Sequence, residues 1–157
     1  MRCAFVYETA LGPMTLAEEN GALTHALFGN VPVAAQLCET PLLHQAFEQL
    51  QEYFAGARQE FTLPVRLQGT PFQLRCWQAL LAIPYGQTRT YGQQAAEVGS
   101  PRACRAVGMA NNRNPLCVFI PCHRVLGKNG GLTGYAGGLE IKQRLLAIER
   151  TDHHDSA

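Results

Sequence analysis

The chain has 157 residues, a hydrophobic content of 46% and a formal net charge of +1, so it can bury one good core or two small ones. No apolar run approaches the roughly 18 residues that a membrane span needs, and the N-terminus meets charge too soon for a signal peptide. Six cysteines without a C-x-x-C pair favour neither a disulfide framework nor a zinc knuckle, which fits the reducing cytoplasm.

The charge is divided unevenly along the chain. Residues 1–65 carry seven acidic and two basic side chains, giving −5, whereas residues 66–150 carry eleven basic and three acidic ones, giving +8. The tail from Thr151 adds −2. A strongly basic half favours a nucleic-acid partner, because phosphate contacts need Lys and Arg, although solubility alone can produce such asymmetry.

The first 68 residues predict a small α+β domain that serves as a scaffold. Strand-like segments lie at 3–7, 14–17 and 23–28. Asn20-Gly21 between the last two predicts a hairpin. A helix is expected from Leu42 to Phe54 after Pro41, with an apolar stripe at 43, 46 or 47, 50 and 54.

A second domain, 69–150, is predicted to be mostly helical. Thr70, Pro71 and Gln73 form a capping-box pattern, so a helix should begin here and run to about Ile83. Its buried face is expected to consist of apolar side chains, namely Trp77, Leu80 and Leu81. Trp77 is interpreted as a core residue rather than as a platform for a stacked base.

Two further helices predict a helix-turn-helix. Thr90 caps a short helix over 91–98, Gly99-Ser100 makes a turn, and Pro101 starts a helix to about Asn111. The second helix carries small residues and two arginines: Arg102, Ala103, Arg105, Ala106, Gly108 and Ala110. Such a face can approach DNA closely, with arginines for phosphates or a base stack. Close helix packing with solvated arginines explains the pattern equally well.

The apolar run 116–120 predicts a buried strand that stops at Pro121, which places Cys122 at a strand end. His123 and Arg124 follow directly. A base or a positive charge beside a thiol favours the nucleophilic thiolate. A lone Cys-His pair would still be explained better by a buried structural cysteine.

Six glycines between Gly127 and Gly138 lack a nucleotide-binding pattern and instead suit close approach of backbone to a flat ligand. A last helix is expected over 139–150, followed by a disordered tail at 151–157. Its predicted buried stripe consists of Ile141, Leu145 and Ile148, with Glu149 on the same face. A carboxylate there should need a partner, and His123 is the candidate; an exposed terminal glutamate is the alternative.

The heptapeptide Ile120–Leu126 reads apolar-Pro-Cys-His-Arg-apolar-apolar and resembles the signature of the O6-alkylguanine-DNA alkyltransferase family. The resemblance extends to Asn114-Pro115, to the glycine-rich 134–138 and to the region 91–108, so it covers roughly residues 70 to 150. It implies repair of O6-alkylguanine in double-stranded DNA, with O4-alkylthymine as a further candidate lesion. It also implies a single turnover by a monomer that needs no cofactor.

The resemblance assigns roles residue by residue. Cys122 would attack the alkyl carbon, His123 would take the thiol proton, and Glu149 would hold His123. Tyr91 would donate to the base and Asn114 would brace the turn. Val125, Tyr135 and Ala136 would line the pocket. The DNA-facing residues would be Arg102, Ala103, Arg105, Ala106 and Gly108, with Arg105 filling the place of the extruded base, whereas Arg124 is expected to contact protein.

Some interpretations stay open. Some members of the family carry a structural zinc in the N-terminal domain, yet Cys3, His25, Cys38 and His44 match no compact zinc spacing. Departures at Arg113, Cys117 and Ala136 leave the pocket size and the turn geometry undecided. The alternative functions are a non-catalytic sensor of alkylated bases and a helix-turn-helix regulator.

Overall fold

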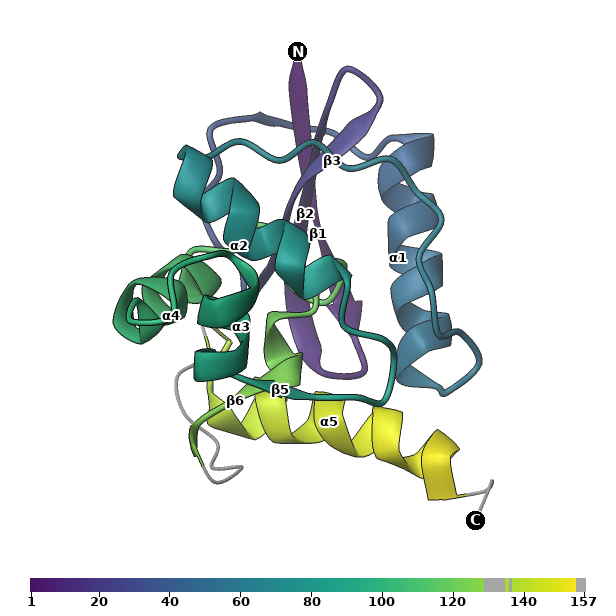
Figure 1. Cartoon of the computed structure of the whole chain (residues 1–157). Helices are drawn as coiled ribbons and strands as arrows, with labels where there is room; N and C mark the ends of the chain where they lie inside the picture. The colour runs from purple at the N-terminus through teal and green to yellow at the C-terminus, as the bar shows by residue number, and fades with distance from the viewer. Residues whose placement is uncertain (129–134, 136, 155–157) are drawn as a thin grey trace. The chain divides into compact units, whose positions relative to one another are not determined.

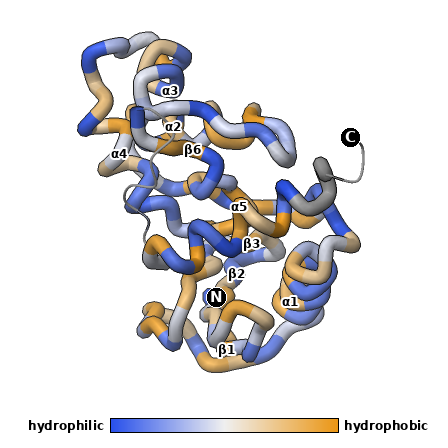
Figure 2. Tube along the Cα trace, turned by 90° about the horizontal axis from the view of Figure 1, so that it is seen from below, coloured by the Kyte–Doolittle hydropathy of each residue, from blue (hydrophilic) through white to orange (hydrophobic). Residues whose placement is uncertain are grey.

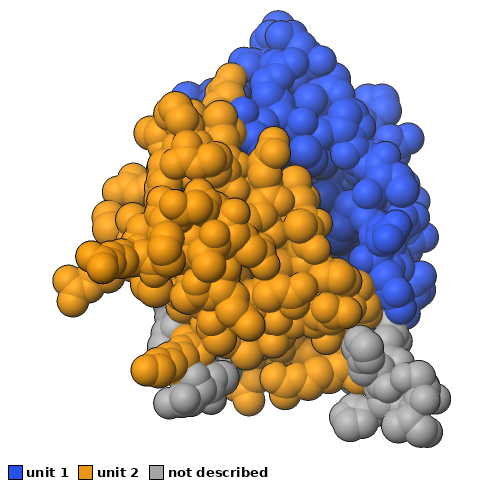
Figure 3. All heavy atoms as spheres, viewed as in Figure 1, with its two compact units in different colours: residues 1–67, 115–119 blue, residues 68–114, 120–157 orange. Residues whose placement is uncertain are grey.

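The computed structural model describes residues 1–128, 135 and 137–154 (Figure 1). The chain forms two compact units, coloured separately in Figure 3: unit 1 contains residues 1–67 and 115–119, and unit 2 contains residues 68–114 and 120–157. Unit 1 is an α+β unit and unit 2 is mostly helical, which confirms the predicted order of an α+β part followed by a mostly helical part. The division into functional domains 1–68 and 69–150 stays a prediction.

Unit 1 is built on a four-stranded sheet in the order β3-β2-β1-β4. The strands are β1 Arg2–Thr9, β2 Gly12–Glu19, β3 Ala22–Phe28 and β4 Gln36–Leu37. The first three form antiparallel hairpins, and β4 runs parallel to β1. Asn20 and Gly21 have φ of 52° and 81°, which is the left-handed pair that a tight hairpin turn requires, so the predicted hairpin is confirmed.

Helix α1 (Pro41–Phe54) runs beside this sheet (Figure 1). Thr40 caps it by accepting a hydrogen bond from the amide of Leu43, and Figure 2 shows hydrophilic and hydrophobic residues alternating along it. Its buried residues are Leu43, Ala46, Leu50 and Tyr53. The predicted stripe was therefore wrong at its last position, where Tyr53 rather than Phe54 is buried.

Unit 2 opens with α2 (Pro71–Leu81), and both hydrogen bonds of the predicted Thr70–Gln73 capping box are present. Trp77 is buried and donates its indole N–H to the carbonyl of Ala110 at 2.9 Å, which confirms it as a core residue. Two details were wrong: the helix ends at Leu81 rather than Ile83, and Leu81 is 49% exposed.

Two short helices follow, α3 (Tyr91–Glu97) and α4 (Cys104–Asn112). The predicted Thr90 cap of α3 is confirmed as a full capping box. Helix α4 begins later than the predicted Pro101, because the amide of Ala103 bonds to the carbonyl of Ser100 in a separate turn. Strands β5 (Arg89–Thr90) and β6 (Val125–Leu126) pair in parallel in the same unit.

The predicted strand over 116–120 is wrong, although all five residues are buried. Leu116 forms an isolated bridge with Ala26 in unit 1, and Val118 then adopts a φ of 74°, which breaks an extended path. An unbroken apolar run indicates burial but not strand pairing. Cys122 consequently begins a 3-10 turn, η1 (Cys122–Arg124), instead of ending a strand.

Helix α5 (Leu139–His154) closes the described chain. Its buried residues are Lys142, Leu145, Leu146 and Glu149, so the predicted stripe was displaced: Ile141 and Ile148 are only partly buried. The helix also continues through 151–154, where a disordered tail was predicted. None of the helices in the described part of the chain has the length and apolar composition of a membrane span.

Candidate active site

The site is built around Cys122, which is 4% exposed at the start of η1. The side-chain amide of Asn114 donates to its Sγ at 3.2 Å and to the carbonyl of Ile120 at 2.8 Å. Asn114 directly precedes the segment 115–119, and Ile120 directly follows it. One buried amide therefore joins the two ends of this segment and supplies an N–H to the sulfur, where it favours the thiolate.

His123 is fully buried, and its Nε2 lies 2.7 Å from Oε2 of Glu149. The predicted pairing of these two side chains is confirmed. The contact brings together residues 26 positions apart in the chain. It fixes the orientation of the imidazole and leaves Nδ1 as the ring nitrogen that can exchange a proton with another group.

Arg124 holds the other side of the same carboxylate. Its Nε and Nη2 donate to the two oxygens of Glu149 at 2.9 and 3.0 Å, and its Nη1 donates to the carbonyl of Ile83 at 2.7 Å. The amide of Gly86 donates to Oε1 of Glu149 at 3.2 Å. Arg124 thus contacts protein, as predicted, and satisfies a carboxylate that would be costly to bury alone.

The protonation states follow from these contacts. Burial alone would raise the pKa of Glu149, but the hydrogen bonds of His123 and Arg124 and the positive charge of Arg124 outweigh it and lower the pKa to about 2. Burial lowers the pKa of His123; Glu149 opposes the shift, and Arg124 and Lys142 add to it. Because Arg124 already neutralises Glu149, we assign His123 as neutral and able to accept a proton.

Lys142 was not predicted as a site residue. Its side chain is fully buried, and its Nζ lies 5.8 Å from the ring centroid of Tyr91. Burial lowers the pKa of Lys142, and the Coulombic attraction of Cys122 opposes that shift. The signal was its spacing, because Lys142 lies three residues before Leu145 and seven before Glu149, on the buried face of α5.

The other predicted pocket residues are placed as follows. Tyr91 begins α3 and is partly buried, and a Cβ on Gly108 of α4 would meet its ring at 3.8 Å. Val125 is fully buried in β6, and Tyr135 is partly buried. Ala136 lies outside the described residues. Tyr91 therefore connects the start of α3 with both α4 and Lys142.

The predicted DNA-facing residues differ in their exposure. Arg102, Arg105 and Ala106 are exposed, Ala103 and Gly108 are partly buried, and Ala110, which was placed with them, is in the core. Arg102 and Ala103 precede α4, because the helix begins at Cys104. The exposed arginines suit a phosphate partner.

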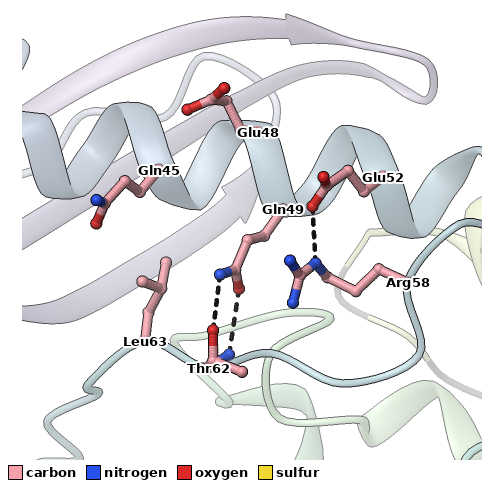
Figure 4. Close-up of a pocket in the computed structure, with 7 residues that line it drawn as sticks. All are labelled: Gln45, Glu48, Gln49, Glu52, Arg58, Thr62 and Leu63. Carbon is pink, nitrogen blue, oxygen red and sulfur yellow. Dashed lines mark hydrogen bonds and ion pairs between the residues drawn. The ribbon is translucent and has the colours of Figure 1, made fainter.

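Unit 1 offers a different kind of surface. Figure 4 shows a hollow beside α1 lined by Gln45, Glu48, Gln49, Glu52, Arg58, Thr62 and Leu63. Gln49 bonds to Thr62 and Glu52 pairs with Arg58, so its polar groups are largely engaged with one another. Among the described residues, no three His, Cys, Asp or Glu side chains form a group suited to a metal ion.

Comparison with known proteins places this geometry in a family. The family model described as "6-O-methylguanine DNA methyltransferase, DNA binding domain" matches residues 71–151. A second model, described as "6-O-methylguanine DNA methyltransferase, ribonuclease-like domain", matches residues 1–67. A constitutive methylated-DNA–protein-cysteine methyltransferase of Bacillus subtilis is 50% identical over 157 residues, covering 94% of this chain and 95% of its own.

Solved structures agree with the sequence relatives. The Mycobacterium tuberculosis OGT, solved in complex with DNA, superposes with a TM-score of 0.88 at 43% identity, covering 95% of this chain and 93% of its own. A methylated-DNA–protein-cysteine methyltransferase of Methanosarcina acetivorans is 45% identical over 92% of this chain and 96% of its own. The chain therefore belongs to the 6-O-methylguanine DNA methyltransferase family.

Proposed function

We propose that the protein repairs DNA by transferring the alkyl group of O6-alkylguanine irreversibly to its own Cys122. The observation that carries this proposal is the buried thiol of Cys122, which accepts a hydrogen bond from Asn114 and is followed directly by a histidine fixed on Glu149. A nucleophile, a neighbouring base and a group that orients the base form the arrangement that nucleophilic catalysis needs. Relatives named methylated-DNA–protein-cysteine methyltransferase support the substrate.

The proposed transfer needs no cofactor, because the protein and the lesion supply every atom and electron pair of the reaction. The thiol proton passes to Nδ1 of His123, directly or through a water, since Nε2 is held by Glu149. The sulfur then bonds to the alkyl carbon as the bond from that carbon to O6 breaks, and the electron pair stays on the guanine. A proton returned to the base yields unmodified guanine in DNA. The thioether on Cys122 has no facile exit, so each molecule acts once.

Tyr91 and Lys142 are placed to assist the charges of this step. Lys142 is a buried side chain whose Nζ lies 5.8 Å from the ring centroid of Tyr91 and whose pKa is lowered by burial and raised in part by the charge of Cys122. As a cation it favours the thiolate and stabilises the negative charge that develops on Tyr91 as its hydroxyl donates to the departing guanine. Val125 lies three residues after the nucleophile and is buried, and we assign it with Tyr135 and Ala136 to the pocket wall.

We assign DNA binding to a helix-turn-helix formed by α3 and α4. Arg102, Arg105 and Ala106 present an exposed surface at the start of α4, and residues 66–150 carry a charge of +8. The relative solved with DNA supports this partner. The target base must leave the duplex to meet a buried thiol, and Arg105 is the candidate to occupy the vacated stack. A cytoplasmic location and a monomeric state remain predictions.

The proposal is tested by intact mass after the protein is mixed with duplex DNA that contains O6-methylguanine. We expect a gain of one methyl group on Cys122, located by peptide mapping, and no more than one equivalent repaired per protein. Repeated turnover by limiting protein would contradict irreversible transfer. Methylation at Cys104 or Cys117 instead would contradict the assignment of the nucleophile.

The assignment of Arg105 gives a second prediction. Arg105→Ala should slow repair of duplex DNA, whereas its reaction with a free base such as O6-benzylguanine should be nearly unchanged, because only a duplex base must be flipped at a cost of a few kcal/mol. Arg75→Ala, which removes an exposed arginine of α2, is the matched control for charge. Equal slowing of both reactions would place Arg105 in the active site or in the fold.

Lys142 gives a third prediction. Lys142→Met keeps most of the volume but removes the charge, so alkyl transfer from duplex DNA and from the free base should both slow, by about ten- to a hundredfold. The fold should be retained, because a desolvated cation is replaced by an apolar side chain. Lys128→Met changes an exposed lysine and serves as the control. Wild-type rates in Lys142→Met would remove Lys142 from the mechanism.

A further inference from the structure

A buried amide pair joins the two helices that we assign to DNA binding. Gln94 of α3 and Asn111 of α4 are 1% and 4% exposed. Nδ2 of Asn111 donates to Oε1 of Gln94 at 2.8 Å, and Nε2 of Gln94 donates to Oδ1 of Asn111 at 3.0 Å. Two parallel hydrogen bonds between planar amides fix distance and orientation together.

The pair extends into α2. Nε2 of Gln94 also donates to the carbonyl of Cys76 at 3.1 Å, and the neighbouring Trp77 donates to the carbonyl of Ala110 at 2.9 Å. The C-terminal part of α4 is therefore held by directional bonds from two other helices. These bonds satisfy the side-chain amides of Gln94 and Asn111 and the indole N–H of Trp77, which would be costly to bury in an apolar core without partners.

The apolar contacts around the pair cannot set the orientation of α4 as sharply. The core cluster consists of Cys76, Ala95, Val107 and Ala110, with Phe72, Tyr91 and Val98 packed against it. Most of its central side chains are small, and apolar contact is not directional. The N-cap residue of α4, Ala103, makes no side-chain capping bond. Among the described residues, the polar bonds at Asn111 and Ala110 therefore give α4 a directional attachment that the apolar contacts do not.

We propose that the Gln94–Asn111 pair is a positioning device that sets the orientation of α4, and thereby places Arg105 for the flipped-out state of duplex DNA. Asn111 lies six residues after Arg105, so the fixed point and the exposed arginine are about 9 Å apart along the helix axis. A small rotation at the pair becomes a displacement at Arg105, and misplacement by about 1 Å can cost two orders of magnitude in rate.

This inference rests on the proposed function and predicts an effect confined to the duplex. Gln94→Leu/Asn111→Leu removes both amides together, so neither amide is left without its partner, and only the carbonyl of Cys76 loses the bond from Gln94. We expect this variant to fold, to react with free O6-benzylguanine or O6-methylguanine at nearly the wild-type rate, and to repair duplex DNA about tenfold more slowly. The exchange variant Gln94→Asn/Asn111→Gln keeps an amide pair of the same total reach and should recover duplex repair.

A role through Arg105 is tested by combining the variants. In an Arg105→Ala background, loss of the amide pair should slow duplex repair little further, because residues that act through one another are not additive. Gln94→Met is a single substitution of similar length that leaves the amide of Asn111 without its partner, so it should be less stable but should show the same selective loss, and it gives a second test should the leucine pair fail to fold. Thermal unfolding of each variant separates a loss of stability from a loss of positioning.

The outcomes decide the inference separately from the proposed function. Methyl transfer by the wild-type protein tests the function alone. Wild-type duplex repair in both the leucine pair and Gln94→Met would overturn the positioning role, as would equal slowing of the duplex and free-base reactions. Additive losses in the Arg105→Ala background would overturn the route through Arg105.

Discussion

Replacement of Cys122 by serine is expected to abolish alkyl transfer to the protein, both from duplex DNA and from a free base. The hydroxyl of serine is much less acidic than a thiol, so His123 cannot remove its proton as readily, and the alkoxide does not form near neutral pH. Asn114 can still donate to the new side chain, so the turn around position 122 should be preserved. The measurement is intact mass after reaction, with gel-shift binding to O6-methylguanine DNA on the same samples.

Binding separates a transferase from a sensor of alkylated bases. If the protein acts by transfer, the Cys122→Ser variant should still bind damaged DNA, but it should gain no alkyl group and should repair no lesion. Cys104→Ser, which changes an exposed cysteine, should leave transfer intact and is the control. A wild-type protein that binds the lesion but gains no mass would favour the sensor and contradict the transferase.

Much of the site could be predicted from local sequence. The pairing of His123 with Glu149 followed from a carboxylate on the same helix face as Leu145, which must find a partner when buried. The Thr70 and Thr90 capping boxes followed from short-range hydrogen bonds that depend on residues three apart. Local rules succeed here because the interacting groups are close in sequence or because burial leaves them few partners.

Other features depended on partners far along the chain. The run 116–120 was predicted as a strand because it is apolar, but its bridge to Ala26 and the turn at Val118 depend on unit 1. Lys142 was passed over because a lysine is normally read as exposed. The Gln94–Asn111 pair was likewise invisible, since neither polar residue indicates burial until its partner is known.

Glu149 is the residue whose loss should cost most stability. Its carboxylate is 1% exposed and binds His123, Arg124 and the amide of Gly86. Glu149→Gln leaves Arg124, which is 8% exposed, as a buried cation without its counter-charge. Breaking a buried ion pair in this way costs about 3 to 5 kcal/mol, so urea unfolding should show a large fall in the free energy of unfolding. Glu140→Gln, at an exposed position in the first turn of the same helix, should change it little.

The pH dependence gives the same prediction an independent test. A fall of the Glu149 pKa from 4.5 to about 2 on folding corresponds to roughly 3 kcal/mol of stability. This contribution is complete above pH 4.5 and is lost as the pH falls towards 2, because the unfolded carboxylate takes up its proton first. Glu149→Gln lacks the titrating group, so the stability difference between the wild-type protein and this variant should shrink across that range. A difference that stays constant down to pH 2 would show that Glu149 is not held as a carboxylate by Arg124 and His123.

Glu149→Gln should also slow alkyl transfer about 100-fold or more, because His123 loses the charge that orients it as a proton acceptor.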